Sequence, residues 1–305
     1  MSRNPIVSSS LISIENATPS IKRFTFRVDG VPAKQEFKFR PGQWVELSLP
    51  SLPSLGKTRF SISCSPDGNA TQQQRAFSVT VKDAYQNPIV KYLHDPARRV
   101  GDGSLFHAQV GGAFWYREAS PDGAGDNANA VQKVLLIAGG VGIAPLMSML
   151  EYVVQGSVGG VLNGAQYPSR KRTHVTLLYS VQDEMELLYV DRLRDLATTF
   201  HPGSTGLRLV LDIQLYVTRY AIRKPDSNQE DLVVQSQTNN PLKFYYGCYI
   251  TPRLLSDYLS SSDADMDSTT IYMCGPESLE RSVYSHLQKL EFPIERSLHF
   301  ERWWK

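Results

Sequence analysis

The most constraining feature of this sequence is the run from Lys133 to Leu146, which predicts a buried strand, a glycine-rich turn and the start of a helix. Residues Val134–Ala138 are all apolar, as in a strand buried on both faces of a parallel sheet. The glycines that follow permit a tight turn and a close approach of a ligand, and Pro145 suits the first helical position. Because a helix N-terminus carries free N–H groups and the positive end of a dipole, a pyrophosphate fits at this turn.

The turn alone leaves a second interpretation open. Gly140-x-Gly142 lacks the third glycine of the dinucleotide fingerprint, and no Lys-Ser/Thr pair of a phosphate loop follows it. A tight strand-to-helix crossover in any α/β domain needs glycine for packing and binds nothing. Other segments must distinguish the two.

Composition excludes several classes of function. The 305 residues suggest about two domains, and a net charge of +2 gives no reason to expect nucleic acid or an anionic membrane as the main partner. Cys64, Cys248 and Cys274 are too few and too far apart for a zinc site or an iron–sulfur cluster, and their odd number argues against a disulfide framework. We therefore expect no metal and a reducing compartment.

Hydropathy gives expectations about location and reaction class. No apolar run approaches the roughly 20 residues that span a bilayer, so we expect no transmembrane segment. A strand-like alternation already begins at Leu11, which leaves little room for a presequence and favours a cytoplasmic over a mitochondrial location. The six histidines are scattered and no Gly-x-Ser-x-Gly elbow occurs, which disfavours zinc chemistry and serine hydrolysis.

The two halves of the chain differ in periodicity. Up to about Tyr116, short period-two runs separated by turns indicate an antiparallel barrel or sandwich, with one short helix at Ile89–His94; the runs are Ile21–Val28, Gln43–Leu49 and Ala76–Val81. From Gln132 onward strands alternate with helices, which indicates a parallel-sheet α/β domain. The expected strands are Val134–Ala138, Val175–Tyr179, Leu207–Val217 and Thr270–Cys274, and the expected helices are Met147–Val154, Glu186–Thr199, Arg253–Leu259 and Glu277–Leu290.

These patterns predict a β-barrel domain over residues 1–117, a linker loop over 118–131 and an α/β domain over 132–305. Polar stretches at 156–172 and 223–240 are interpreted as mobile insertions.

Two more segments fall where a nucleotide-handling protein would use them. Ile271–Ser278 is a strand that ends in Cys274-Gly275-Pro276 and starts a helix. Ligands of an open parallel sheet sit beyond the carboxyl ends of its strands, so this turn and the Gly139–Pro145 turn should line one crevice. A small buried hydrophobe is the other interpretation of Cys274. The second segment, Arg59-Phe60-Ser61, lies in the β half.

The order of the motifs resembles the ferredoxin–NADP reductase superfamily over nearly the whole chain. The motifs are Pro41-Gly42-Gln43, Arg59-Phe60-Ser61, Gly111-Gly112-x-Phe114, Gly140 to Pro145, Cys274-Gly275-Pro276 and a terminal Glu301-Arg302-Trp303-Trp304. Within the superfamily, the Asn87-Pro88 pair and the terminal sequence are most like those of the oxidoreductase NAD-binding-domain-containing proteins. The resemblance implies a flavin-binding antiparallel β-barrel, then a Rossmann-like NAD(P)-binding domain whose C-terminal strand returns to the flavin.

On the flavin side, the resemblance matches the family's Arg-x-Tyr-Ser motif to Arg59–Ser61. Arg59 would pair with flavin phosphate, Ser61 would hydrogen-bond near flavin N5, and Phe60 would pack against the ring or the ribityl chain. The glycines at 111 and 112 would also border the cofactor. Val90 stands where a phosphate-binding Ser or Thr often occurs, which leaves backbone N–H groups of the short helix for that role. FAD is expected, and FMN stays open.

On the nucleotide side, the resemblance assigns the pyrophosphate to the first turn and the nicotinamide to the second. The residues of these two turns are Gly139, Gly140, Val141, Gly142, Ala144, Pro145, Cys274, Gly275 and Pro276. Glu301 would relay protons or orient the nicotinamide, and the alternative is a surface charge. Trp303 or Trp304 would cover the flavin, and hydrophobic anchoring is the alternative for either. Ser61, Cys274 and Glu301 are the expected catalytic residues.

Ser180 and Gln182, near the end of the next strand, are expected at the adenosine ribose. Asp183 and Glu184 follow Gln182, and acidic residues accept a hydrogen bond from a free 2′-hydroxyl but repel a phosphate. We therefore expect NADH, while Ser180, Arg192 or Arg194 could still contact the ribose phosphate of NADPH. The resemblance implies a reductase that passes hydride to flavin and electrons to a separate acceptor, which could be a protein, a quinone or a small molecule. A flavin- and nucleotide-binding regulatory or assembly subunit is the alternative.

Overall fold

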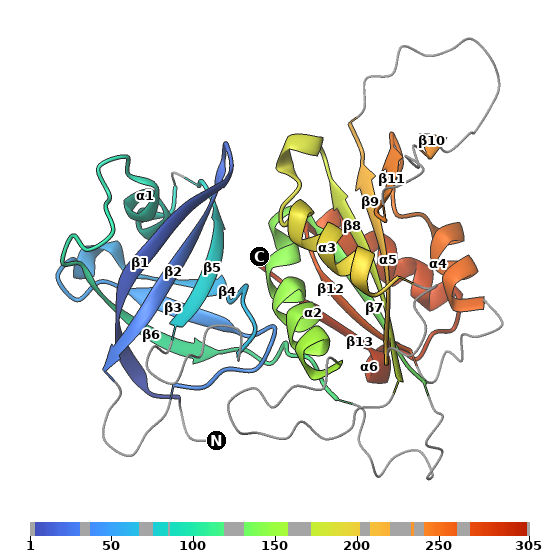
Figure 1. Cartoon of the computed structure of the whole chain (residues 1–305), viewed down its shortest axis with the longest axis horizontal. Helices are drawn as coiled ribbons and strands as arrows, with labels where there is room; N and C mark the ends of the chain where they lie inside the picture. Colours follow the sequence, from blue (N-terminus) through green and yellow to red (C-terminus); the bar gives the residue numbers. More distant parts are fainter. Residues whose placement is uncertain are drawn as a thin grey trace. The chain divides into compact units, whose positions relative to one another are not determined.

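The computed structural model describes residues 4–30, 37–66, 76–84, 86–118, 131–157, 172–201, 208–219, 233–234, 241–260 and 269–303. The chain divides into two compact units, one of residues 1–118 with 144–168 and the other of residues 119–143 with 169–305 (Figure 1). The predicted domain boundaries stay predictions, since compactness and not cofactor binding defines these units.

The first unit contains a six-stranded antiparallel sheet in the order β4-β3-β6-β1-β2-β5. Its strands are β1 (Ile6–Thr18), β2 (Ile21–Gly30), β3 (Trp44–Ser48), β4 (Lys57–Ser61), β5 (Ala76–Lys82) and β6 (Leu105–Gly111). An antiparallel bridge between Ile62 and Val79 joins the two edges of the sheet, so that it closes into the expected barrel. Alternate apolar side chains from every strand fill its interior, with Phe24, Phe26 and Phe106 fully buried.

Two helices complete this unit. The short helix α1 (Pro88–His94) lies close to its predicted position and buries Ile89, Val90 and Leu93. Helix α2 (Ile143–Ser157) is tied to the barrel through Ser148, whose hydroxyl donates a 2.6 Å hydrogen bond to the carbonyl of Cys64. The Ser65 hydroxyl likewise donates to the Gln155 side chain at 2.7 Å.

The second unit contains a seven-stranded sheet in the order β10-β11-β9-β8-β7-β12-β13. The strands are β7 (Val131–Gly139), β8 (Arg172–Val181), β9 (Leu209–Val217), β10 (Val233–Val234), β11 (Lys243–Tyr246), β12 (Thr269–Cys274) and β13 (Leu298–Glu301). All neighbouring pairs are parallel except β10 with β11. The expected parallel α/β architecture is therefore confirmed.

Helices α4 (Pro252–Ser260) and α5 (Glu277–Lys289) bury Leu255, Val283 and Leu287 in one core with Ile137 and Met273 of the sheet. Helix α3 (Val190–Thr199) packs against β9, and the one-turn helix α6 (Ile294–Ser297) precedes β13.

Three local expectations need revision. The helix expected from Glu186 starts at Val190, because Glu184–Glu186 forms a separate 3-10 turn and Tyr189 has φ +60°. Pro145 is the third residue of α2, not the first, and it is tolerated there because the first turn has no intrahelical use for its N–H. Val233 and Val234 form a strand inside the expected insertion at 223–240. Residues 119–130 and 158–171, and most of 223–240, lie outside the described residues.

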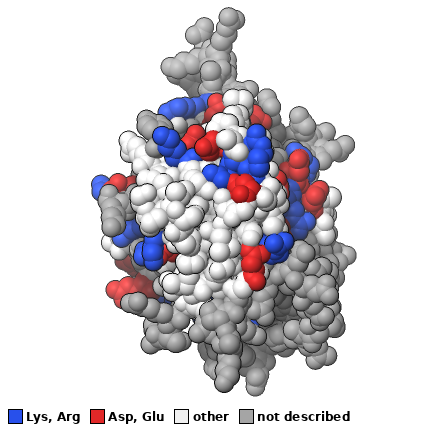
Figure 2. All heavy atoms as spheres, turned by 90° about the vertical axis from the view of Figure 1, so that its left-hand side faces the viewer, with Lys and Arg blue, Asp and Glu red and all other residues white. Residues whose placement is uncertain are grey.

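Surface charge and helix length relate to two partners that the composition gave no reason to expect, nucleic acid and a membrane. On the face drawn in Figure 2, charged side chains of both signs lie mostly around a broad uncharged area. Among the residues that the structure describes on that face, no single-sign patch of the kind that attracts nucleic acid is seen. In the part of the chain that the structure describes, none of the helices is long and apolar enough to cross a membrane.

Candidate active site

Four of the predicted site residues lie in a row along the carboxyl edge of the parallel sheet. The strand register pairs Ser180 of β8 with Gly139 of β7. It also pairs Cys274 of β12 with Ala138 on one side and with Glu301 of β13 on the other. The turns after β7 and β12 therefore leave the sheet side by side, at the edge where open parallel sheets bind ligands.

Glycine is required where these two turns meet. A Cβ on Gly142 would collide with the carbonyl oxygen of Cys274, and one on Gly139 would lie 2.5 Å from Cδ of Pro276. A Cβ on Gly275 would lie 3.1 Å from the backbone nitrogen of Gly139. Gly140 differs, since it has φ +55° and a Cβ added to it would have no neighbouring atom within 4 Å. Packing thus accounts for three glycines, while Gly140 borders open space that a ligand can enter.

Cys274 is fully buried at the centre of this edge, with 1% of its surface exposed. Burial raises the pKa of its thiol far above the usual 9.0, and the nearby carboxylate of Glu301 raises it further. A hydrogen bond with the Trp303 side chain acts in the opposite direction. Cys274 is therefore a small buried residue with a neutral thiol at the point where the two turns meet, and its place beside a nicotinamide stays a prediction.

The C-terminal segment reaches the same edge. Glu301 is half-buried at the end of β13, and Trp303, two residues on, is 43% exposed while its side chain contacts Cys274. The carboxylate of Glu301 therefore acts electrostatically on Cys274, and its role toward a nicotinamide stays a prediction. Trp304 lies outside the described residues.

The predicted ribose contacts lie one strand further along. Ser180 is half-buried near the end of β8, and Gln182, the first residue after that strand, is exposed. The Asp183 side chain accepts a 2.9 Å hydrogen bond from the N–H of Met185 and so caps the turn that follows. The contact of Gln182 with a ribose therefore stays a prediction, while Asp183 already has a structural role.

The predicted flavin-phosphate arginine needs a correction. The four-residue motif Arg-x-Tyr-Ser ends at Ser61, so counting back places Thr58, not Arg59, at the arginine position. Successive strand residues face opposite sides, and Phe60 accordingly lies in the barrel core while Arg59 is 57% exposed. Arg59 and Phe60 therefore cannot contact one face of a ligand together.

Sequence reasoning missed Trp44, the aromatic residue that shares the outer face of the barrel with Arg59 and Ser61. Trp44 pairs with Ser61 of β4 and with Gly111 of β6. Its ring lies where Cβ atoms on Gly111 and Gly112 would be, and the Arg59 guanidinium stacks 4.6 Å from the ring centroid. The Nε of Arg59 also lies 3.3 Å from a carboxylate oxygen of Glu46. The sequence signal for this placement was the strand alternation of Trp44-Val-Glu, which puts Trp44 on the side opposite the valine.

The N–H groups of α1 are already used. The Asn87 side-chain oxygen accepts hydrogen bonds from the N–H groups of Ile89 and Val90, at 3.1 and 3.2 Å. It also accepts one from the Thr58 hydroxyl at 3.1 Å. The expectation that these N–H groups are available to a phosphate is therefore wrong for this conformation.

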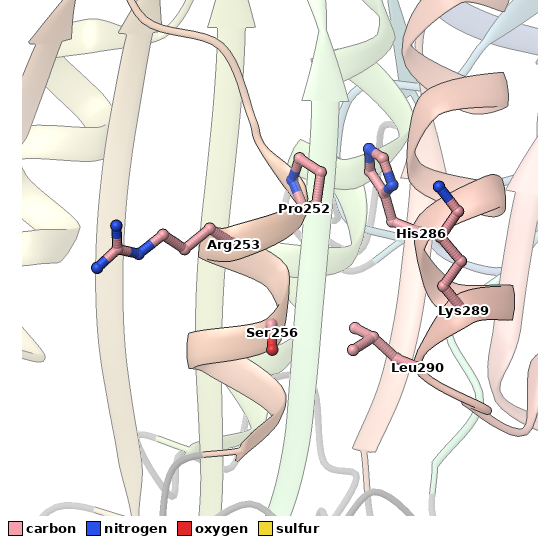
Figure 3. Close-up of a pocket in the computed structure, with 6 residues that line it drawn as sticks. All are labelled: Pro252, Arg253, Ser256, His286, Lys289 and Leu290. Atoms are coloured by element: carbon pink, nitrogen blue, oxygen red, sulfur yellow. The ribbon is translucent and has the colours of Figure 1, made fainter. Parts of the chain in front are cut away.

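A hollow lined by basic side chains lies elsewhere in the second unit, between α4 and α5 (Figure 3). It is lined by Pro252, Arg253, Ser256, His286, Lys289 and Leu290. His286 and Lys289 lie at the C-terminal end of α5, about 20 Å along the helix from the Cys274 turn. Figure 3 shows Arg253 extending away from the other two basic residues, so the hollow does not combine their charges on one ligand.

The comparisons with known proteins agree with the geometry of the carboxyl edge. The family model of the oxidoreductase NAD-binding domain matches residues 136–207, which contain the Gly139–Gly142 turn and Gln182. Human oxidoreductase NAD-binding domain-containing protein 1 is 28% identical to this chain, covering 99% of the chain and 81% of the relative. The electron transfer component of 2-halobenzoate 1,2-dioxygenase from Burkholderia cepacia is 24% identical, with coverage of 92% and 63%.

A similar fold occurs in a solved structure, the ferredoxin NADP+ reductase from Neisseria gonorrhoeae with bound FAD and NADP. The TM-score is 0.61 over 97% of this chain and 98% of that one, at 16% sequence identity. At this identity the likeness shows the fold alone. The chain therefore has the fold of this ferredoxin NADP+ reductase, its residues 136–207 match the oxidoreductase NAD-binding domain, and it resembles the oxidoreductase NAD-binding domain-containing proteins along almost its whole length.

Proposed function

We propose that this chain is a flavin-dependent NAD(P)H reductase that takes hydride from NADH, less readily from NADPH, and supplies electrons to a separate acceptor. The observation that carries the proposal is the convergence of three predicted segments on the carboxyl edge of one parallel sheet. Gly139–Gly142, Cys274–Pro276 and Glu301 come from distant parts of the sequence, and strand register brings them together. Packing explains Gly139, Gly142 and Gly275, so the open space beside Gly140 is the feature of this edge that supports a bound ligand.

The residues of the edge fit a pyridine nucleotide. The N–H groups at the start of α2 and the open side of Gly140 would receive the pyrophosphate. The buried neutral thiol of Cys274 gives the nicotinamide an apolar neighbour with no charge. Glu301, beside it in the register, would orient the carboxamide or hold a proton near the redox atoms.

The outer face of the barrel offers a different set of flavin contacts from those of the family motif. We infer that Trp44 supplies the aromatic surface, Ser61 a hydroxyl donor and Arg59 a cationic donor, since all three lie on that face. A bound flavin supplies hydride acceptance from NADH and onward electron transfer. Arg59 would have to exchange its contact with Glu46 for a phosphate, which a half-exposed arginine can do at small cost.

The acceptor is proposed to be a separate redox protein. The Burkholderia relative is named as an electron transfer component of a dioxygenase, and the match to it covers 92% of this chain. Electron delivery to a partner enzyme is the role that this likeness supports.

A regulatory or assembly subunit is the second candidate, and two observations favour it. Phe60 is buried in the core of the barrel, and Asn87 already occupies the N–H groups of α1. Both reduce the contacts available to a flavin, so weak flavin retention would suit a subunit without turnover of its own.

Purification in the presence of FAD separates the two candidates. The reductase retains stoichiometric flavin and oxidises NADH with an artificial electron acceptor, whereas the subunit does not turn over. A protein that binds no added FAD or FMN would contradict the reductase. Trp115, whose ring stacks on the Arg40 guanidinium at 4.8 Å, offers a control of the same size and chemistry. Trp44→Ala should lower flavin content more than Trp115→Ala, and equal retention would contradict the role given to Trp44.

Gln182→Arg tests the nucleotide preference. A guanidinium at this exposed position would pair with a ribose 2′-phosphate, so the ratio of kcat/KM for NADPH to that for NADH should rise roughly tenfold or more. Arg194→Gln is a useful control, since Arg194 is paired with Asp191 on the same unit. An unchanged ratio in Gln182→Arg would place the ribose elsewhere.

A further inference from the structure

We propose that Glu280 and Arg302 form a positioning pair that holds the C-terminal segment so that Trp303 covers Cys274. This inference concerns the same carboxyl edge as the proposed function and rests on it only for its consequence, the control of nicotinamide access. Its structural part depends on contacts within the second unit alone.

The pair joins the terminal segment to α5. Both Nε and an Nη of Arg302 donate to the same carboxylate oxygen of Glu280, the Nε at 2.7 Å. The Glu280 side chain is only 7% exposed, and the hydrogen bond with it is the largest of the effects that raise the pKa of Arg302. A buried carboxylate is costly without a partner, so Arg302 is strongly held.

Strand alternation converts this hold on Arg302 into an orientation of Trp303. Phe300 and Arg302 share one side of the terminal segment, where the guanidinium lies 4.4 Å from the Phe300 ring centroid. Glu301 and Trp303 face the other side, which Cys274 shares through its register with Glu301. With Arg302 fixed to α5, the Trp303 side chain is directed toward the Cys274 thiol, with which it forms a hydrogen bond.

Other ion pairs on α5 do not have these properties. Arg281 pairs with Glu277 one turn away on the same helix, but those side chains are 77% and 40% exposed. The charge of Glu277 raises the pKa of Arg302 less than the hydrogen bond with Glu280 does. A solvent-exposed pair of this kind holds little in place. Arg281 is therefore a matched control for Arg302.

The arrangement predicts that the pair controls access to the edge. Trp303 is 43% exposed, so only part of its ring is held by packing, and release of Arg302 frees the segment that carries it. A nicotinamide that reaches Cys274 must displace Trp303, so a weakened pair should tighten nucleotide binding while exposing the thiol.

The test is the rate at which a small thiol reagent labels Cys274 in the full chain without nucleotide, with each cysteine resolved by mass spectrometry. In the variants Glu280→Gln and Arg302→Met, the reagent should label Cys274 roughly tenfold faster than in the parent protein, because each substitution breaks charge-assisted hydrogen bonds to a buried group. Arg281→Met should stay within about twofold, as expected for an exposed pair. Parent-like rates in both Glu280→Gln and Arg302→Met would overturn the proposal.

Cys64 serves as an internal control for folding, because it is fully buried in the first unit. General unfolding would expose both thiols, whereas release of the terminal segment exposes Cys274 alone. If both thiols are labelled quickly in Arg302→Met, that variant has unfolded. The labelling rate of Cys274 in the milder variant Glu280→Gln then tests the proposal. In a variant that lacks residues 303–305, Cys274 should be labelled as fast as in Glu280→Gln and Arg302→Met. Fast labelling in this deletion combined with slow labelling in Glu280→Gln would show that Trp303 covers the thiol without the pair, which also overturns the proposal.

Nucleotide protection separates this inference from the proposed function. Added NADH should slow the labelling of Cys274 in Glu280→Gln if the edge binds nicotinamide. Fast labelling that NADH does not slow would contradict the proposed nucleotide site while leaving the positioning pair intact.

Discussion

At the scale of single residues, positions 140 and 142 of the Gly140-x-Gly142 turn require glycine for different physical reasons. Gly142 lies against the backbone of Cys274, whereas Gly140 has a left-handed conformation beside open space. The sequence predicted a tight turn here, but it could not separate packing from ligand approach. That distinction depends on which strand is the neighbour of β7, and β12 follows it by about 130 residues.

Gly142→Ala should therefore destabilise the protein and weaken nucleotide binding together. The new Cβ would force the β7 and β12 turns apart, at a cost of roughly 1–3 kcal/mol in the free energy of unfolding. Urea unfolding and NADH titration measure the two effects. Gly30→Ala is the control, since nothing lies within 4 Å of its Cβ position. Equal stability of the two variants would contradict the contact between the turns.

At the scale of elements, prediction succeeded where a pattern was long and strongly periodic. The strand expected at Thr270–Cys274 and the helix expected at Glu277–Leu290 agree with β12 and α5 to within one residue. The short strands β4 and β13 carry too few apolar residues for periodicity alone to identify them. The roles of Arg59 and Trp44 depended on these short strands, because only strand pairing shows which residues share the outer face of the barrel.

Helix α1 gives a prediction at this scale. The Asn87 side chain caps it with two hydrogen bonds and also receives the Thr58 hydroxyl of β4. Asn87→Ala should lower the free energy of unfolding by about 1 kcal/mol, as the loss of an N-cap does, while Asn87→Asp should keep most of it. Chemical denaturation of the three proteins measures this. Stability of Asn87→Ala equal to that of the parent would mean that water or a ligand replaces the cap.

At the scale of the whole molecule, the order of motifs predicted both folds that the chain contains, although no single motif did. The carboxyl edge was predicted because parallel strands end together, which is a property of the sheet and not of any residue. The Glu280–Arg302 pair could not be predicted, because Glu280 has the sequence context of an ordinary charge in the first turn of a helix.

Buried thiol and phenol groups make the free energy of unfolding of the whole molecule depend on pH. Burial raises the thiol pKa values of Cys64 and Cys274 above the usual 9.0, and burial also raises the pKa of Tyr179. These groups ionise in the unfolded chain near and above pH 9 but stay neutral in the folded one, so stability is full below that pH and falls as pH rises through it. Urea unfolding at pH 8 and pH 10 measures the fall, which Cys274→Ala should make smaller. A pH-independent unfolding free energy in this interval would contradict the burial of these groups.

The proposed reaction at the carboxyl edge is the transfer of hydride from a pyridine nucleotide to a bound flavin. Anaerobic rapid mixing of the FAD-loaded protein with NADH, followed through the visible absorbance of the flavin, tests this proposal. We expect the flavin to bleach in a single turnover, faster with NADH than with NADPH, and more slowly in Gly142→Ala. An oxidised flavin that neither nucleotide bleaches would contradict the claim.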